Sequence, residues 1–334
     1  CVLCGSLFQV VDSGQSEPNQ FCVIINWILS GMTLRSKIRD YRFFYKPDSR
    51  ALYKSVFRNW MKSLLLPFYA KSSCSLKKCD GSRLVIPRCR WPMLATTCRL
   101  ILAGATVIWR DDEVEAHFGE YCFYSPADSR LFGPSIQSIF VDDEWRIRDL
   151  DLEGQVAVTI GGHIGIVAVA LAKKGAIVHV FEPFSAFVEY IKKNALVNKV
   201  DDRIIIHPVG LSDSNRHVST IKECSEMASH THGCTGSTAS AELVEALSYL
   251  ERQCIRDVAL LEMNCEGCEY RILSQDFINL LRPERIHMEF HKGAGSLVSL
   301  LERNSYRVEH NTDLNKPKGK LFAKRELLLR DPLK

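Results

Sequence analysis

Short apolar runs alternate with amphipathic stretches from about residue 152 onward. The runs at 155–160 and 177–181 are rich in β-branched residues and predict buried strands, and residues 165–174 between them have helical spacing. The same alternation predicts further strands at 203–208, 257–263, 285–290, 305–310 and 320–327. Further helices are expected at 184–198, 240–252, 271–281 and 296–303.

This alternation predicts an α/β fold with a seven-stranded, mostly parallel, Rossmann-like sheet and helices on both of its faces. The last two strands are joined by the polar loop DLNKPKGK, which is too short to contain a helix. We therefore expect these two strands to run antiparallel to each other. The main domain is assigned to residues 151–330.

The part of the chain before this domain has a different pattern. Residues 1–105 form a mainly helical appendage whose role the sequence does not indicate, with helical spacing at 51–68. Residues 77–87 predict a hairpin that turns at Asp80-Gly81. Residues 106–150 begin with alternating, strand-like positions broken at Phe118-Gly119, and are expected to form a β-rich entrance segment.

A glycine turn follows the first strand of the main domain. Gly161, Gly162 and Gly165 come directly after it, and Glu182 stands at the carboxyl end of the second strand. Glycines allow close approach to a ligand, and the acid can accept hydrogen bonds from both ribose hydroxyls of an adenosine cofactor. The G-x-G-x-x-G spacing of dinucleotide sites is absent, which favours S-adenosylmethionine (SAM), because SAM has no phosphate. A turn of this shape without any ligand is the structural alternative.

Four motifs in order resemble one enzyme family: TIGGHIG (159–165), FEP (181–183), EMNCEGCE (262–269) and EFH (289–291). Over residues 107–329 the chain resembles the FkbM family of SAM-dependent methyltransferases. That family typically shows D-x-G-A-N-x-G, F-E-P, K-x-D-x-E-G-x-E and E-x-H at these places. The resemblance implies the class I methyltransferase architecture, SAM as the cofactor and methyl transfer as the reaction.

Four positions depart from the family pattern. Thr159 stands where the family has Asp, His163 where it has Asn, Glu262 where it has Lys, and Asn264 where it has Asp. Thr accepts a hydrogen bond but has no charge, and Asn264 keeps the shape of a carboxylate without its charge. A catalytically weakened or inactive member therefore stays open as an alternative.

The resemblance also implies site residues at the carboxyl ends of the strands, where ligands bind in open α/β sheets. The glycines are expected to hold the methionine part of SAM, Glu182 the ribose, and Gly210 and Leu211 the adenine. The full set of predicted cofactor residues is Thr159, Gly161, Gly162, His163, Gly165, Glu182, Gly210, Leu211 and Asn264.

For catalysis, His291 is the preferred general base, because an imidazole titrates near neutral pH. Glu266 and Glu289 are competing bases, or they orient His291 or the acceptor. A surface histidine at a strand end is the alternative for His291. No metal site is assigned, and the acidic run at 142–144 is interpreted as a solvated loop, although a Mg²⁺ site there stays open.

Composition bears on the partners and the cellular compartment of the protein. The net charge of +4 does not demand a nucleic-acid partner. The thirteen cysteines are scattered, and the pair Cys265-x-x-Cys268 is interpreted as incidental, so a reducing, cytoplasmic compartment is predicted. The apolar run at 21–32 is too short to span a bilayer, which leaves peripheral membrane contact open. The oligomeric state is not indicated.

The leading hypothesis is O-methylation of a hydroxyl on a sugar, glycan or secondary metabolite, with a small molecule or glycan as the acceptor. A non-catalytic SAM-fold binding protein is the second hypothesis. The third is an RNA methyltransferase that uses the basic, aromatic region 33–110, although the diffuse charge makes a nucleic-acid partner unexpected.

Overall fold

The structure is a computed structural model that describes residues 47–65, 73–87, 93–110, 112–127, 129, 131–218, 240–310, 313 and 316–326. The chain divides into two compact units, Cys1–Ala95 and Thr96–Lys334. The domain boundaries expected at residues 105 and 150 stay predictions. The apolar run at 21–32 and the aromatic residues at 41–45 lie outside the described residues. No helix in the described ranges is long and apolar enough to cross a membrane.

The described part of the first unit contains two short helices and a hairpin. The helices are α4 (Pro47–Val56) and α5 (Trp60–Leu65), and the antiparallel strands are β1 (Ser73–Lys77) and β2 (Arg83–Pro87). The predicted hairpin is confirmed, with Gly81 at φ +93° in its turn. One helix over 51–68 was expected, but the chain breaks at Phe57, which is buried and forms a bridge with Lys78 of the hairpin. This tertiary pairing overrides the local helical pattern.

The second unit begins with a small antiparallel sheet, as the alternation predicts. After α6 (Leu94–Leu102), strands β3 (Thr106–Trp109), β4 (Glu113–Phe118) and β5 (Tyr121–Pro126) pair in the order β3-β4-β5. Gly119, at φ +53°, lies in the turn between β4 and β5. Helix α7 (Phe132–Ile136) then continues into one π-helical turn, η3 (Gln137–Val141).

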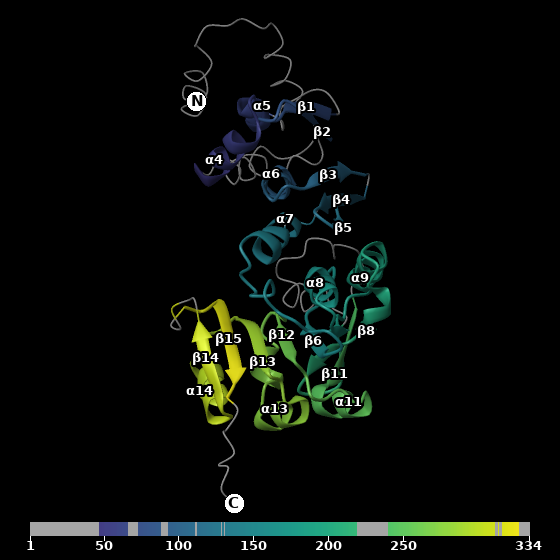
Figure 1. The fold of residues 1–334 in the computed structure, drawn as a ribbon, viewed down its shortest axis with the longest axis vertical. Coiled ribbons are helices and arrows are strands. Elements are labelled where there is room, and N and C mark those ends of the chain that lie inside the picture. Colours follow the sequence, from purple (N-terminus) through teal and green to yellow (C-terminus); the bar gives the residue numbers. More distant parts are fainter. Residues whose placement is uncertain are drawn as a thin grey trace, which may run out of the picture. The chain divides into compact units, whose positions relative to one another are not determined.

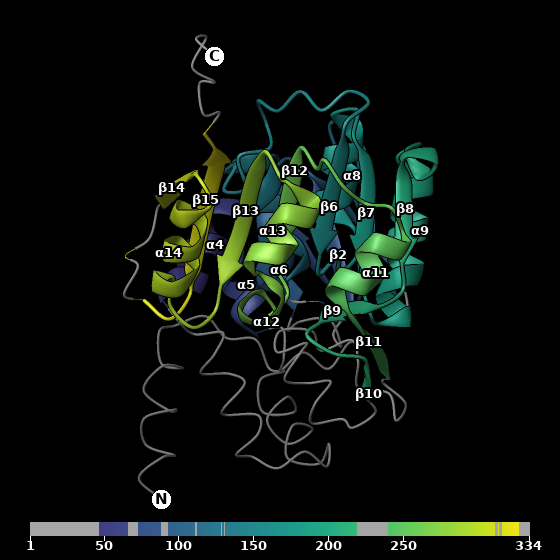
Figure 2. The same cartoon turned by 90° about the horizontal axis from the view of Figure 1, so that it is seen from below.

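The main sheet contains all seven predicted strands. They are β6 (Val156–Ile160), β7 (Ile177–Phe181), β8 (Ile204–His207), β12 (Leu260–Met263), β13 (Arg285–Phe290), β14 (Tyr306–His310) and β15 (Gly319–Arg325). Their order is β14-β15-β13-β12-β6-β7-β8 (Figures 1 and 2). β15 runs antiparallel to both of its neighbours, β13 and β14, and all other pairs in this sheet are parallel, so the expected reversed strand is confirmed.

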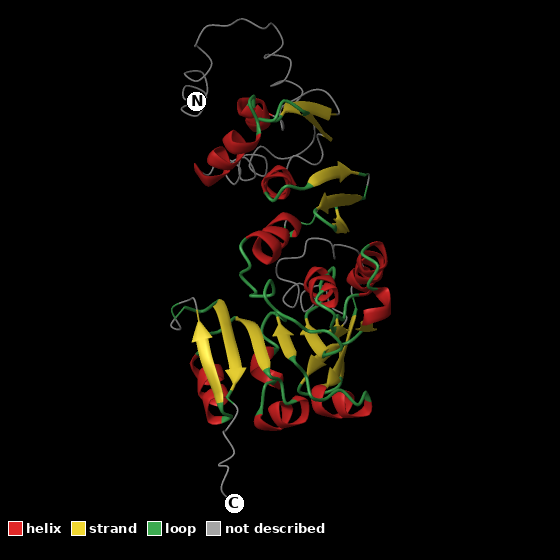
Figure 3. Ribbon diagram, in the orientation of Figure 1, coloured by secondary structure: helices red, strands yellow, loops and turns green. Residues whose placement is uncertain are grey.

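Helices cover both faces of this sheet (Figure 3). One face carries α8 (Ile166–Lys173) and α9 (Ser185–Val197), and the other carries α11 (Ala246–Arg252), α13 (Gln275–Leu281) and α14 (Gly295–Arg303). Side chains alternate along β6 accordingly: Ala157 joins the core under α8, whereas Val158 and Ile160 join the core on the other side. This is the class I methyltransferase fold that the sequence pattern predicts.

Two predicted helices differ in the structure. Residues 240–252 contain strand β11 (Ala241–Glu245) before α11, because Ala241 and Leu243 alternate inward, and the Glu245 side chain caps α11. β11 pairs with β9 (Gly210–Ser212) and β10 (Arg216–Val218) in a small sheet that the sequence did not predict. Residues 269–281 form two helices, α12 (Glu269–Ile272) and α13, because the Ser274 hydroxyl caps a new N-terminus. The short 3-10 turn η4 (Asp201–Arg203) precedes β8.

Candidate active site

A cleft of about 1030 Å³ lies at the carboxyl ends of β6, β7, β12 and β13, all within the second unit. Its wall includes predicted site residues from distant parts of the chain: Gly161, Gly162, His163, Glu182, Gly210, Leu211, Asn264, Glu266 and Glu289. The parallel strands bring these residues to one edge of the sheet. Their roles toward a ligand remain predictions.

The glycine turn after β6 is shaped by packing on both sides. Gly161 has φ +92°, and a Cβ atom on it would lie 2.1 Å from the carbonyl oxygen of Asn264. A Cβ atom on Gly162 would lie 2.3 Å from Cγ1 of Val180 on β7. The two glycines are therefore required because the turn fits between β7 and the loop after β12, a reason that the sequence alone did not provide.

Glu182 points back at this turn. Its Oε2 accepts a hydrogen bond from the backbone N–H of His163 at 2.7 Å, and its Oε1 accepts one from Phe184 at 3.0 Å. Burial raises the pKa of Glu182 to about 7, and these two bonds oppose the rise only in part. Each carboxylate oxygen keeps a lone pair that can accept a ribose hydroxyl.

His163 occupies the left-handed region at φ +47°, a conformation that His tolerates better than most side chains. Its ring packs on Phe187, with ring centroids 4.7 Å apart, and burial lowers its pKa to about 4. Two other predicted cofactor residues, Thr159 and Gly165, do not line the cleft. Gly165 precedes α8 against Ile191, while the buried Thr159 hydroxyl has no hydrogen-bond partner within the described residues.

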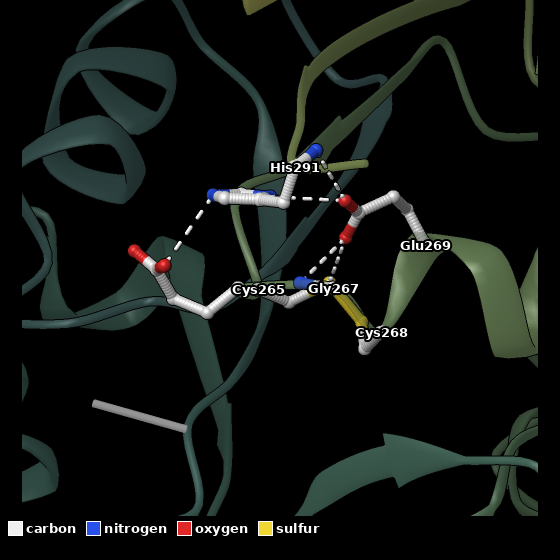
Figure 4. The surroundings of a disulfide bond; sticks show 6 residues. Cys265, Gly267, Cys268, Glu269 and His291 are labelled. Atoms are coloured by element: carbon white, nitrogen blue, oxygen red, sulfur yellow. Dashed lines mark hydrogen bonds and ion pairs between the residues drawn. A yellow bond between two sulfur atoms is a disulfide. The ribbon is translucent and has the colours of Figure 1, made fainter. Parts of the chain in front are cut away.

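The predicted catalytic residues are organised around Glu269, a residue to which the sequence analysis gave no role. Its fully buried carboxylate accepts hydrogen bonds from the backbone N–H of Gly267 (2.9 Å) and of His291 (3.1 Å), and lies 2.9 Å from His291 Nδ1. On the other side of the ring, His291 Nε2 lies 3.4 Å from Glu266 Oε2 (Figure 4). Glu266 lines the cleft and His291 does not. The second acid of the E-G-x-E motif was the signal for Glu269.

Lysines complete this end of the cleft. Lys318 Nζ lies 3.2 Å from Glu289 Oε1 and 4.0 Å from Glu266 Oε1. Lys320 pairs with Glu144, whereas the neighbouring Asp143 accepts backbone hydrogen bonds from the turn that follows it. Asp143 is thus held by bonds to the following turn and Glu144 by a lysine far along the chain, and the lysines were not anticipated from the sequence.

Glu262 is a buried acid on the cleft wall. It is 2% exposed, and no hydrogen bond from a described residue holds its side chain. Burial, and then the nearby charge of Glu289, raise its pKa well above the ordinary value. Glu262 is therefore easier to protonate than an ordinary glutamate.

Cys265 and Cys268 form a disulfide bond beside His291 (Figure 4). The sequence analysis interpreted this pair as incidental; the C-x-x-C spacing itself was the only signal. The described free cysteines are Cys74, Cys79, Cys98, Cys122 and Cys254.

Two groups of side chains among the described residues have ligand atoms close enough for a metal ion. Glu115, His117 and Cys122 lie together on β4 and β5, but Arg110 already donates to the Glu115 carboxylate at 3.1 Å. The other group is Cys265, Cys268 and Glu269, and its two sulfur atoms are bonded to each other. Neither group is assigned a metal.

Residues 160–308 match the family model of the Methyltransferase FkbM domain, which confirms the resemblance expected from the sequence. Among solved structures, an FkbM methyltransferase from Methylobacillus flagellatus KT is similar at 14% identity and a TM-score of 0.36, covering 51% of this chain and 43% of that one. A SAM-dependent methyltransferase from Agrobacterium tumefaciens is similar at 12% identity and a TM-score of 0.39, covering 66% and 72%. An O-methyltransferase from Bacillus cereus shares 12% identity at a TM-score of 0.34, covering 52% and 74%. No curated protein matches the chain.

Proposed function

We propose that this chain, whose residues 160–308 are an FkbM methyltransferase domain, binds SAM in the cleft and methylates a hydroxyl of a sugar, glycan or secondary metabolite. The observation that carries the proposal is the position of Glu182. This buried carboxylate lies against the glycine turn, accepts the His163 N–H at 2.7 Å and lines the cleft. That arrangement suits a ribose diol beside the turn.

The residues present fit the cofactor. Gly161 and Gly162 leave no side chain over the turn, and Leu211, in the middle of β9, offers an apolar surface on the same cleft wall. When bound, SAM would supply a methyl group already activated by its sulfonium. The chain therefore has to orient the acceptor, exclude water and receive one proton.

Glu266 is the residue that we propose receives this proton. It reaches the cleft wall, whereas His291 lies behind it, so His291 is better suited to position Glu266 than to touch the acceptor. Glu269 in turn holds the ring through Nδ1 at 2.9 Å. This assignment exchanges the roles expected from the sequence, in which His291 was the preferred base.

The acceptor end of the cleft supports a hydroxyl-rich substrate. The pairs Glu289–Lys318 and Glu144–Lys320 place hydrogen-bond acceptors and donors side by side on the wall. A polyol can exchange hydrogen bonds with both partners of such a pair. Asn264 also lines the cleft. Its amide has no charge, so the non-catalytic alternative is tested together with the proposed function.

Calorimetric titration with SAM tests the proposal directly. The wild-type chain is expected to bind, Glu182→Ala to bind at least about tenfold more weakly through loss of charge-assisted hydrogen bonds, and Glu251→Ala, an exposed acid on α11, to bind like wild type. Absence of binding at millimolar SAM would refute the assignment.

Transfer is then assayed with methyl-labelled SAM against fractionated pools of glycans, metabolites and RNA. Glu266→Gln should retain SAM binding and lose labelling. Binding without labelling of any pool by the wild-type chain would favour the non-catalytic protein, and labelling of RNA alone would favour the third hypothesis.

A further inference from the structure

The Cys265–Cys268 disulfide closes the short loop that joins β12 to α12. Both cysteines line the cleft and are half-buried, so a small thiol can reach them. Among the described free cysteines, Cys74, Cys98 and Cys122 are buried, whereas Cys79 and Cys254 are exposed. The pair differs from all five because its two sulfur atoms are bonded to each other at the wall of the cleft, where a small thiol can attack them.

The loop contacts both halves of the site. On the cofactor side, Gly161 packs on the Asn264 carbonyl and on Cα of Cys265, which would lie 3.3 Å from an added Cβ. On the catalytic side, the loop carries Glu266, whose Oε2 lies 3.4 Å from His291 Nε2. A change in the loop would therefore reach the turn and the histidine together.

The bonded loop has an unusual backbone. Glu266 has φ +54° and Gly267 has φ +108°, and both residues lie between the two bonded cysteines. The left-handed region is unfavourable for a non-glycine residue, so Glu266 stays there only while its surroundings require it. Opening the bond removes one of these constraints.

We propose that Cys265 and Cys268 are a redox-active pair, and that their reduction by a cellular dithiol repositions Glu266 and thereby controls the site. A thiolate of the dithiol attacks one Sγ, and the Cys265–Cys268 bond breaks as a mixed disulfide forms. The second thiol of the reductant then attacks this mixed disulfide. The reductant leaves as its own disulfide, and two electrons and two protons remain on the cysteines.

Glu269 offers a partner for the reduced state. Its Oε2 lies 3.5 Å from Cys265 Sγ, which can donate a hydrogen bond once it carries a proton. The same carboxylate already holds Gly267 and His291, so the new thiol competes with the groups that order the site.

The experiment uses the full chain equilibrated with oxidised or reduced dithiothreitol. Alkylation and mass spectrometry count the thiols of the pair, and nitrogen-15 histidine spectra at one pH follow the His291 ring. We expect the pair to cycle between two thiols and none, and the His291 signal to move with it. Affinity for SAM, a readout that rests on the proposed function, should change at least about fivefold, the lower end of typical site-to-site coupling.

Two variants distinguish an effect of the Cys265–Cys268 pair from general effects of the redox buffer. The double variant Cys265→Ser with Cys268→Ser should give one His291 signal in both buffers, close to that of the reduced wild type. Cys254→Ser, at an exposed free thiol, should respond as wild type does.

The proposal is overturned if the pair remains thiol in oxidising buffer, if Zn²⁺ rather than oxidation protects it, or if the His291 signal is the same in both states. Thiol counts and the His291 signal need no cofactor. A chain that fails to bind SAM in either state would therefore refute the proposed function and leave this test intact.

Discussion

At the scale of single residues, three buried carboxyl groups differ in what holds them. Glu269 accepts from two backbone N–H groups beside His291, Glu182 accepts from two others, and Glu262 has no described hydrogen bond. The pKa of Glu182 rises to about 7 because desolvation outweighs its two bonds. Burial, and then the nearby charge of Glu289, raise the pKa of Glu262 well above its usual range. The environment decides which of these groups can be ionised when a ligand arrives.

The raised pKa of Glu182 predicts that SAM binding depends on pH. In the role proposed for Glu182, the ionised form would accept both ribose hydroxyls, so affinity should be present above pH 7 and should fall roughly tenfold from pH 8 to pH 6. His163, with a pKa lowered to about 4, stays neutral throughout this window. Titration calorimetry across the range measures the effect, and Glu182→Gln should flatten it. An equal slope in the variant would assign the titration to another group.

The same shift has an opposite consequence for the free protein. The folded-state pKa of Glu182 lies above its unfolded value, so its contribution to stability is complete below the unfolded pKa and is lost as pH rises through about 7. Bound SAM would offset part of that loss by ligand linkage.

At the scale of elements, α9 is attached to the edge strand β5 by two asparagines one helical turn apart. Asn198 accepts from Cys122 N–H and donates to its carbonyl, and Asn194 does the same with Tyr124. Cys122 and Tyr124 are two residues apart on the strand, so their backbone groups point in the same direction. The two asparagines are four residues apart and lie on one face of the helix, so each can reach one of these residues. The helix thereby satisfies an edge that would otherwise be open to pairing.

Asn194→Ala is expected to lower the free energy of unfolding by about 2–4 kcal/mol, because it leaves buried backbone groups of Tyr124 and the carbonyl of Ile164 unpaired. Urea denaturation measures the loss. The matched control is Glu189→Ala on the exposed face of α9, where a surface ion pair contributes at most about 0.5 kcal/mol. Similar losses in both variants would contradict the role of the asparagine.

At the scale of the whole molecule, the described residues that line the cleft lie between Arg99 and Lys320, inside the second compact unit. Strands β3–β5 belong to this unit as well, tied in through α9. We therefore expect a fragment of residues 93–334, which keeps α6 whole, to fold and to bind SAM with the affinity of the full chain. Circular dichroism and calorimetry on both proteins check this. Loss of binding in a folded fragment would show that the first unit contributes to the site.

The periodic pattern determined the seven-stranded sheet, because most of its strands are short apolar runs and helical spacing fills most of the connections between its parallel strands. The motifs located the cleft for the same reason, since the carboxyl ends of parallel strands share one edge. The sequence predictions were wrong in two places where a tertiary contact competed with the local pattern. Phe57 forms a bridge with the hairpin instead of continuing a helix, and Ala241–Glu245 forms a strand beside β9.

The site itself needed the tertiary structure. The need for glycine at position 161 follows only from the packing of the turn against Asn264. The different roles proposed for Glu266 and His291 follow only from their order, with Glu266 at the cleft wall and His291 behind it. The bond between Cys265 and Cys268 depends on a loop conformation that spacing does not specify. Sequence periodicity reports which face of an element is buried, whereas chemistry depends on which atoms meet, and that is decided by residues far apart along the chain.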